Sequence, residues 1–277
     1  MNLLQALPGY GQGYGLRTNY ATLLPPGGRI AAYLGPQTDA IDQYAASNLL
    51  VSTMEQALGR CKAGASDTII VLPGYAETFT GAALSAMVST TRIIGVGNLG
   101  SANAPTMTLS GTGAGLAFDD ADVVFEGMTI AGSTAAITGA VVITARGVNF
   151  VGNRFKCSGA FGANPPIAVT NAADLVFLAN YITASSTDPL VEITGTGTTD
   201  MLIANNFFRQ ITSGDIINVA NEAISGMIAY NIGKSAETQG AGAGMVVIGA
   251  AAATLVANCE NYMSDESVVA GIVATGA

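Results

Sequence analysis

The sequence predicts an all-β fold in which short strands wind into a parallel β-helix with coils of about 26 residues. Two observations predict it: a repeated segment centred on Asn, and a second apolar run within each repeat. The repeated segment has an apolar residue three positions before the Asn. Its spacing is steady along the chain, with Met replacing Asn in the first segment, and the central positions are Met128, Asn153, Asn180, Asn206, Asn231 and Asn258.

The second apolar run lies between successive Asn positions, at residues 141–144, 167–170, 190–194, 216–219 and 245–248. Each repeat therefore contains at least two strands, separated by Gly, Asn, Asp, Ser and Thr. The runs are too short and too rich in β-branched residues to be helices. The Leu spacing of leucine-rich repeats and the 3.6-residue period of helical repeats are both missing. Parallel strands, each pairing with the next coil about 4.8 Å away, fit the pattern.

The repeated Asn is predicted to be a structural residue. Asn tolerates the left-handed backbone conformation that a sharp turn between strands requires, and its amide can bond to the Asn above and below. The alternative is a polar row that binds a ligand. We expect the structural ladder, formed by Asn153, Asn180, Asn206, Asn231 and Asn258.

The chain of 277 residues is poor in charge, with 10% charged residues against a usual share of about 25%. Such a surface favours broad packing against partners. The balance of 19 acidic to 10 basic residues disfavours a nucleic-acid partner, which requires a basic stripe. Residues 240–257 are uncharged enough to mimic a membrane span, but they keep the repeat register. We therefore assign them to buried strands and expect no membrane partner.

Cysteine and histidine usage argues against a metal or cofactor. The three cysteines, Cys61, Cys157 and Cys259, are far apart and are predicted to be reduced and buried. The chain contains no His, which excludes Ser-His and Cys-His catalysis and His-ligated metals. The first nine residues lack the basic region and the long apolar core of a secretion signal.

Residues 1–46 lack the repeat and are punctuated by Gly, Tyr and Pro, which predicts an extended N-terminal arm ahead of a β-helix over residues 47–277. A floppy tail is the alternative. We expect the arm to dock on a partner subunit through apolar and aromatic anchors. These anchors are Leu3, Leu4, Leu7, Tyr10, Tyr14 and Tyr20.

A short capping helix is predicted over about residues 53–63. Ser52-Thr-Met-Glu55 has the capping-box pattern, and Gly64 provides a stop. A strand follows from Thr68 and turns at Pro73-Gly74. Because the open end of a β-helix exposes its apolar stack, the helix is expected to cover that end.

The segment Ser52-Thr-Met-Glu-Gln-Ala-Leu58, followed by Asp67-Thr-Ile-Ile-Val-Leu-Pro-Gly-Tyr-Ala-Glu77, resembles the start of pectate-lyase-like right-handed β-helix proteins. In that superfamily a short helix leads into a Gly-Asp-Thr-Ile-type strand and a Pro-Gly-x-Tyr/His-x-Glu turn. The resemblance covers about residues 50–277 and implies the fold more than a function. More narrowly, segments 57–64 and 72–78 look like β-helical structural proteins of tailed bacteriophages, which are often encoded among head genes.

Catalysis on such a fold would require carboxylates on one outer face, either paired for hydrolysis or binding calcium beside a basic residue. The acidic candidates are Asp119, Asp120, Asp122 and Glu126, with Asp174 and Asp200 expected to stack because they are one period apart. The basic candidates are Arg146, Arg154, Lys156, Arg209 and Lys234. Of the polygalacturonase signatures only Asp-Asp occurs. We therefore interpret these acids as solvated turn residues, with calcium at Asp119, Asp120 and Asp122 as the alternative.

These observations favour a non-enzymatic virion structural protein with no catalytic residue, metal or cofactor. The phage resemblance implies a capsid decoration or cement protein that is made in the host cytoplasm and binds the major capsid protein at the capsid surface through the arm. Closed symmetry favours a homotrimer. The alternative is a tailspike or fibre module that binds or cleaves host polysaccharide, although the chain has no Trp and only 6% aromatic residues. A cell-surface adhesin is a third hypothesis.

Overall fold

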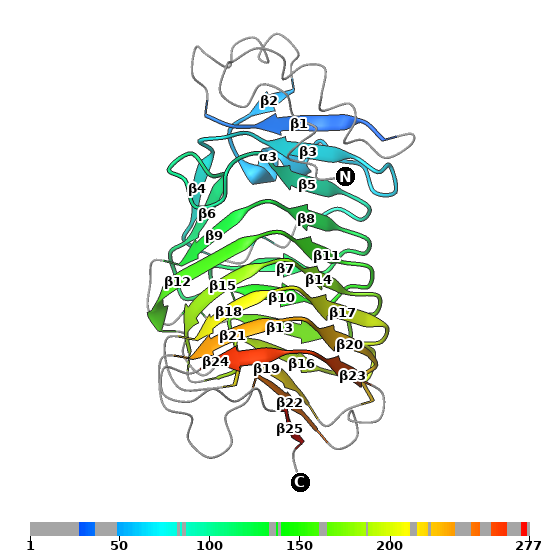
Figure 1. Cartoon of the computed structure of the whole chain (residues 1–277). Helices are drawn as coiled ribbons and strands as arrows, with labels where there is room; N and C mark the ends of the chain where they lie inside the picture. Colours follow the sequence, from blue (N-terminus) through cyan, green and yellow to red (C-terminus); the bar gives the residue numbers. More distant parts are fainter. Residues whose placement is uncertain are drawn as a thin grey trace.

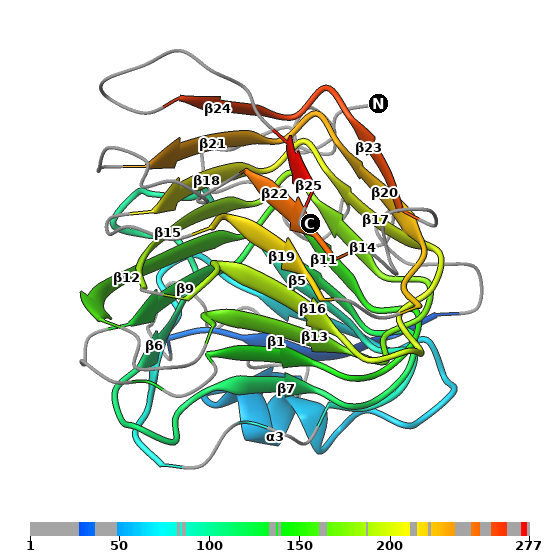
Figure 2. The same cartoon turned by 90° about the horizontal axis from the view of Figure 1, so that it is seen from below.

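Three parallel β-sheets, here called A, B and C, enclose a hydrophobic core, and the chain passes from A to B to C in coil after coil (Figures 1 and 2). The arrangement is the right-handed parallel β-helix with coils of about 26 residues that the sequence predicted. The computed structural model describes residues 28–36, 49–81, 84, 87–132, 137, 140–160, 165–186, 188–210, 215–220, 223–235, 245–249, 256–264 and 273–275.

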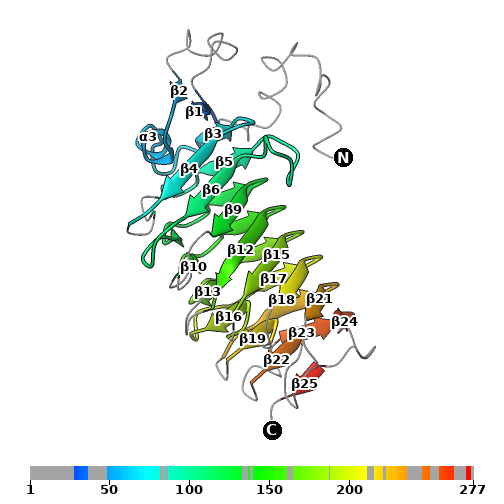
Figure 3. The ribbon, with the colours of Figure 1, turned by 90° about the vertical axis from the view of Figure 1, so that its left-hand side faces the viewer.

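The strands of each sheet follow one another along the helix axis, and Figure 3 looks onto sheet B. Sheet A contains, in spatial order, β2 (Leu50–Val51), β1 (Ile30–Leu34), β3 (Thr68–Val71), β5 (Arg92–Gly95), β8 (Val124–Glu126), β11 (Asn149–Val151), β14 (Val176–Leu178), β17 (Met201–Ala204), β20 (Gly226–Ala229) and β23 (Val256–Cys259). Sheet B contains β4 (Ala76–Phe79), β6 (Thr106–Leu109), β9 (Thr129–Gly132), β12 (Arg154–Ala160), β15 (Tyr181–Ser185), β18 (Phe207–Gln210), β21 (Ile232–Ser235) and β24 (Tyr262–Ser264). Sheet C contains β7 (Leu116–Phe118), β10 (Val141–Ile143), β13 (Ile167–Thr170), β16 (Val191–Thr194), β19 (Ile217–Val219), β22 (Val246–Ile248) and β25 (Val273–Thr275).

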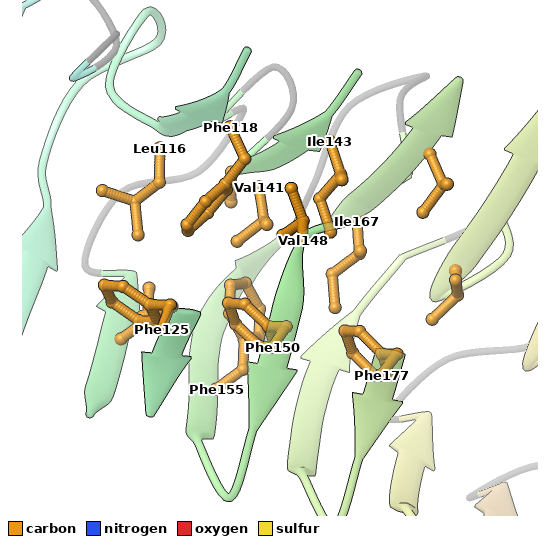
Figure 4. Close-up of a cluster of buried hydrophobic side chains, with 14 of the residues drawn as sticks. Leu116, Phe118, Phe125, Val141, Ile143, Val148, Phe150, Phe155, Ile167 and Phe177 are labelled. Carbon is orange, nitrogen blue, oxygen red and sulfur yellow. The ribbon is translucent and has the colours of Figure 1, made fainter. Parts of the chain in front are cut away.

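Alternate side chains of each strand point into the core, so residues of the same kind stack along the axis. Phe125, Phe150 and Phe177 face one another in register on β8, β11 and β14. Their rings are stacked, with centroids 5.5 and 5.2 Å apart (Figure 4). Phe118 of sheet C meets Phe125 edge-on at 5.4 Å. A register slip of one residue would turn this row toward solvent, so the buried rings fix the pairing.

The β-helix begins earlier in the chain than predicted. β1 pairs in parallel with β3, with Tyr33 opposite Ile70 and Leu34 opposite Val71. This corrects the predicted boundary at residue 46, because residues 30–34 belong to sheet A and not to an arm. The repeat pattern misses β1 because this strand precedes the first Asn-centred segment by more than one period.

The predicted capping helix is present but shorter. α3 spans Met54–Leu58, and Gly59 ends it. Its N-cap is Thr53, whose side chain accepts a hydrogen bond from the Gln56 N–H at 3.3 Å. Gln56 Oε1 in turn accepts from the backbone N–H of Ser52 at 3.3 Å, so the capping pair is shifted by one residue from the predicted one. α3 lies near the N-terminal end of the stack (Figure 1), and its buried Met54, Ala57 and Leu58 join the core.

Candidate functional site

The predicted asparagines line the inside of the A–B corner, the turn that joins each strand of sheet A to the following strand of sheet B. Asn180 Nδ2 donates to the carbonyl oxygen of Phe150 at 2.9 Å, and Asn180 Oδ1 accepts from the backbone N–H of Asn153 at 2.9 Å. The same pair of bonds recurs at each rung, Asn153, Asn206 and Asn231 included. These four side chains are at most 2% exposed. They form a satisfied internal ladder, and these four side chains do not offer a solvent-facing row to a ligand.

The last rung of the ladder is Asn261 and not the predicted Asn258. Asn261 Oδ1 accepts from the backbone N–H of Asn231 at 2.9 Å. Asn258 lies in β23 opposite Ile228, in the inward position that Phe177 and Ile203 occupy in earlier coils. The step from Asn231 to Asn261 is longer than every earlier step between rungs. Extending the regular period beyond Asn231 therefore selects the wrong Asn.

The left-handed backbone conformation expected of the ladder residues belongs instead to the residue before each one. Positive φ angles of 47° to 70° occur immediately before Met128 and the ladder asparagines, at Gly127, Gly152, Ala179, Asn205, Tyr230 and Glu260. The preceding residue makes the sharp turn, and this leaves the Asn side chain directed inward. Asn is thus selected for its hydrogen bonds, and the turn itself accepts several residue types.

The candidate carboxylates gather at the C–A corner, the turn that joins each strand of sheet C to the next strand of sheet A. Asp122, Asp174 and Asp200 have φ angles of 59°, 55° and 55°, and all three are exposed. A Cβ atom added to Gly147, in the next coil, would lie 2.2 Å from Asp122 Oδ1, so this carboxylate packs over the glycine. Asp is one of the few residues that tolerates this conformation. The spacing of these acids therefore follows from the shape of the turn.

Metal binding finds no support in this corner. Asp119 is exposed and Asp120 is half-buried. Across the described ranges, no three Cys, Asp or Glu side chains come close enough to hold a metal ion. Glu126 lies on the outer face of sheet A, where burial raises the pKa of its carboxyl group. The nearby Arg92 opposes this rise.

One carboxylate points inward, at the start of β3. Asp67 is fully buried and accepts hydrogen bonds from Arg29 Nε at 2.7 Å and from the backbone N–H of Lys62 at 2.7 Å. In later coils its position is taken by Thr91 and then by apolar residues such as Val123. The hydrogen bond from Arg29 lowers the pKa of Asp67. This pair joins the segment before β1 to the segment before β3 and thereby anchors the first coil.

A second buried network closes the N-terminus of α3. Glu77 Oε2 accepts from the backbone N–H of Met54 at 2.8 Å and also from the Tyr75 hydroxyl. Burial and this hydrogen bond raise the pKa of Tyr75. Glu77 thus accepts a backbone N–H at the N-terminus of the helix, and Tyr75 holds the Glu77 carboxylate. The Tyr-x-Glu pattern, which is part of the resemblance to β-helix proteins, therefore has a local structural role.

The exposed apolar side chains were not anticipated from the sequence. Within the described ranges, the exposed large hydrophobic side chains are Tyr181, Tyr230, Ile232 and Tyr262, on or beside the A–B corner, and Met227, on the outer face of β20 in sheet A. We call these residues, together with the half-buried Phe207, the A–B edge patch: Tyr181, Phe207, Met227, Tyr230, Ile232 and Tyr262. Four of them directly follow a ladder Asn. The apolar residue at this position is the signal in the sequence that could reveal the patch.

Cations border the A–B edge patch on sheet B. Arg154 lies over the Tyr181 ring, with its Cζ atom 5.5 Å from the centroid. Tyr181 stacks on Phe207 at 4.9 Å with an interplanar angle of 8°. Lys156, Arg209 and Lys234 lie two residues after Arg154, Phe207 and Ile232 on β12, β18 and β21. These three basic residues point outward in one column of sheet B. The patch therefore combines aromatic rings with a basic border.

The remaining predicted features are partly outside the described residues. The arm anchors Leu3, Leu4, Leu7, Tyr10, Tyr14 and Tyr20 all lie there, so the arm stays a prediction. Of the cysteines, Cys157 is buried as predicted, whereas Cys61 is half-buried and Cys259 is exposed. Burial raises the pKa of the Cys61 thiol to about 11. No helix within the described ranges has the length and apolarity to cross a membrane.

Comparison with protein-family models, curated proteins and solved structures gives no match for this chain. Function is therefore inferred from the geometry of its own residues and from the resemblance of segment 52–78.

Proposed function

We propose that the protein is a non-enzymatic structural protein of a tailed-phage virion, a decoration or cement protein that binds the major capsid protein through its N-terminal arm. The A–B edge patch carries the part of the proposal that makes this a structural protein of an assembly, because exposed aromatic and Met side chains are typical of the centre of protein interfaces. The resemblance of segments 57–64 and 72–78 supplies the virion context.

The polar side chains of the coils support a structural role over a catalytic one. The ladder asparagines are buried and paired within the chain. Asp122, Asp174 and Asp200 occupy left-handed turn positions that favour Asp for conformational reasons. Asp67 and Glu77 pair with residues of the first coil. These polar groups therefore each have a role in the fold.

The arm is tested by a deletion that stops at residue 27. Because Arg29 pairs with Asp67 and residues 30–34 form β1, removal of residues 1–46 would also damage the β-helix. The chain lacking residues 1–27 should keep the melting temperature of the full chain and lose binding to capsid shells. Retained binding would contradict the role of the arm.

The virion assignment is tested by the copy number of the protein in purified particles of the phage that encodes it, measured by quantitative mass spectrometry against the major capsid protein. A simple fraction of the capsid protein supports decoration. A handful of copies per particle would place the protein on the tail and favour the tailspike or fibre alternative.

The polysaccharide-binding alternative draws on the exposed tyrosines of sheet B. Sugars stack on the open faces of aromatic rings. The faces of Tyr181 are partly covered by Phe207 and Arg154, which leaves less of this ring open to a sugar. Depolymerisation of a host glycan by the purified chain would establish this alternative and refute the non-enzymatic assignment.

A further inference from the structure

We propose that the A–B edge patch and its basic border form a side-by-side contact between parallel copies of this chain, in which the border meets the acidic C–A corner of the next copy. The inference names the surface that the homotrimer expected from the sequence would use, and it rests on the proposed function as a structural protein of an assembly. Three observations carry it: the exposure of the patch, the distribution of cations, and the matching spacing of the acids.

The exposed apolar side chains of the patch form a continuous group and are not isolated on the surface. Tyr230 is 53% exposed and Ile232 is 49% exposed. Tyr262 lies opposite Ile232 in the next coil, and Tyr181 and Phe207 continue the same column. A contiguous apolar column rimmed by charge is typical of a protein contact.

The cations concentrate on the same sheet. Sheet B carries Arg154, Lys156, Arg209 and Lys234 on its outer face, four of the ten basic residues in the chain. Lys156 and Arg209 are exposed. The guanidinium of Arg154 is fixed over Tyr181, and its Nε atom is buried with no hydrogen-bond partner in the described part of the chain. A basic surface on a chain of formal net charge −9 favours an acidic partner surface.

The chain itself provides such a surface. Asp122, Asp174 and Asp200 are exposed along the C–A corner, before β8, β14 and β17. Lys156 and Arg209 lie on β12 and β18, so the two rows overlap in height along the axis. Both rows advance by the same coil spacing because both belong to the same β-helix. Two parallel copies can therefore keep the acids and cations in register over several coils.

A second copy fits the patch better than a free polyanion. A long polyanion would approach a chain with an excess of acidic residues, and the partly covered Tyr181 ring offers it little stacking. A contact between two different surfaces of identical rods is heterologous, and it closes into a ring when the rotation allows. The three-sided cross-section in Figure 2 suits three such rods around one axis.

The experiment measures the mass of the full chain in solution by sedimentation equilibrium over a range of concentrations. The wild-type chain should form one trimeric species. The double variant Lys156→Glu, Arg209→Glu should weaken self-association by about tenfold or more, because like charges then face each other. Adding Asp174→Lys and Asp200→Lys to that variant should restore the trimer. Arg146→Glu, the same change placed on the acidic corner, should retain it.

The fold of each variant is checked by its thermal melt. If Asp174→Lys and Asp200→Lys impair folding, Ile232→Glu provides an independent test. The Ile232 side chain is already 49% exposed, and its replacement should dissociate the trimer. A monomeric wild-type chain, or a double variant that stays trimeric, would overturn the proposal. A trimer absent from virions would refute the proposed function and leave this interface standing. A monomer found at high copy number on virions would refute this interface and leave the proposed function standing.

Discussion

The A–B and C–A corners both turn the chain through a residue of positive φ, yet they direct their polar side chains to opposite sides. At the A–B corner the residue after the turn is Asn, and its amide points inward and bonds to the coils on either side. At the C–A corner the turn residue itself is often Asp, and its carboxylate points into solvent. A polar residue thus recurs at each of the two corners for a different reason.

The difference teaches that recurrence alone does not indicate chemistry. A buried Asn recurs because removing it leaves backbone groups of neighbouring coils without partners. An exposed Asp recurs because it tolerates the left-handed conformation better than most residues. Substitutions at paired positions in one coil distinguish these two causes, and the following predictions run from the largest expected effect to the smallest.

Asn180→Ala should lower the free energy of unfolding by about 1–3 kcal/mol. The substitution removes the acceptor of the Asn153 N–H and the donor to the Phe150 carbonyl, both of them buried. Urea denaturation measures the loss. The matched variant is Asp174→Ala in the same coil, which should cost less because the carboxylate is exposed. Equal losses in the two variants would contradict the distinction between the corners.

Asp67→Asn should destabilise the chain at neutral pH by removing the charge that Arg29 pairs with. Because the folded-state pKa of Asp67 is lowered, the stabilisation is present above the unfolded-state pKa and is lost as pH falls through the folded value. The wild-type advantage should therefore be constant above about pH 5 and shrink below about pH 4. Denaturant titrations at several pH values measure it, and an advantage that grows on acidification would refute the assignment.

Ala179→Gly should stabilise the chain by roughly 0.5–1 kcal/mol, since Gly relieves the left-handed strain at a φ of 55° but increases the entropy of the unfolded chain. Asp174→Gly, at the same φ in the other corner, should be nearly neutral because Asp already tolerates it. Thermal melts of the two variants give the comparison. Destabilisation by Ala179→Gly would show that the turn is not strained.

Glu126→Gln tests an acid that belongs to a sheet face and to neither corner. Burial raises its folded-state pKa above the unfolded-state pKa. The folded state therefore loses stability as pH rises from the unfolded-state pKa through the folded-state pKa. The Gln variant should be more stable at neutral pH by roughly 0.5 kcal/mol or less, and the gain should vanish below about pH 4. A gain that does not change with pH would contradict the titration of Glu126.

The fold could be predicted because the strand pattern and the Asn repeat are both local. The buried roles of Asn153, Asn180, Asn206 and Asn231 also follow from that period. That Asn261 and not Asn258 is the last rung could not be predicted, because the last coil is longer and only the pairing of Ile228 with Asn258 reveals the register. β1 was missed for a similar reason, since its partner β3 lies more than one period away along the chain.

The candidate site was harder to predict than the fold. The apolar residues after Asn180, Asn206, Asn231 and Asn261 are visible in the sequence, but their exposure depends on which side of sheet B they face. Two adjacent apolar residues, such as Phe207 and Phe208, look alike in the sequence. The strand pleat buries Phe208 and leaves Phe207 on the outer face. Only the register of sheet B separates core from surface here.

The A–B corner has one further consequence, for how this chain can change in length. From β8 onward, inward-facing residues on its two sides are five positions apart, as in Phe150 and Phe155, Phe177 and Ile182, and Ile203 and Phe208. In the earlier coil of β5 and β6 the equivalent residues, Ile93 and Met107, are farther apart. The length of chain from sheet B to sheet C varies, being greater from Phe155 to Ile167 than from Ile182 to Val191. Insertions and grafted peptides should therefore be tolerated between sheets B and C and rejected at the A–B corner of the coils from β8 onward, so that one edge of the rod keeps a constant length while another varies.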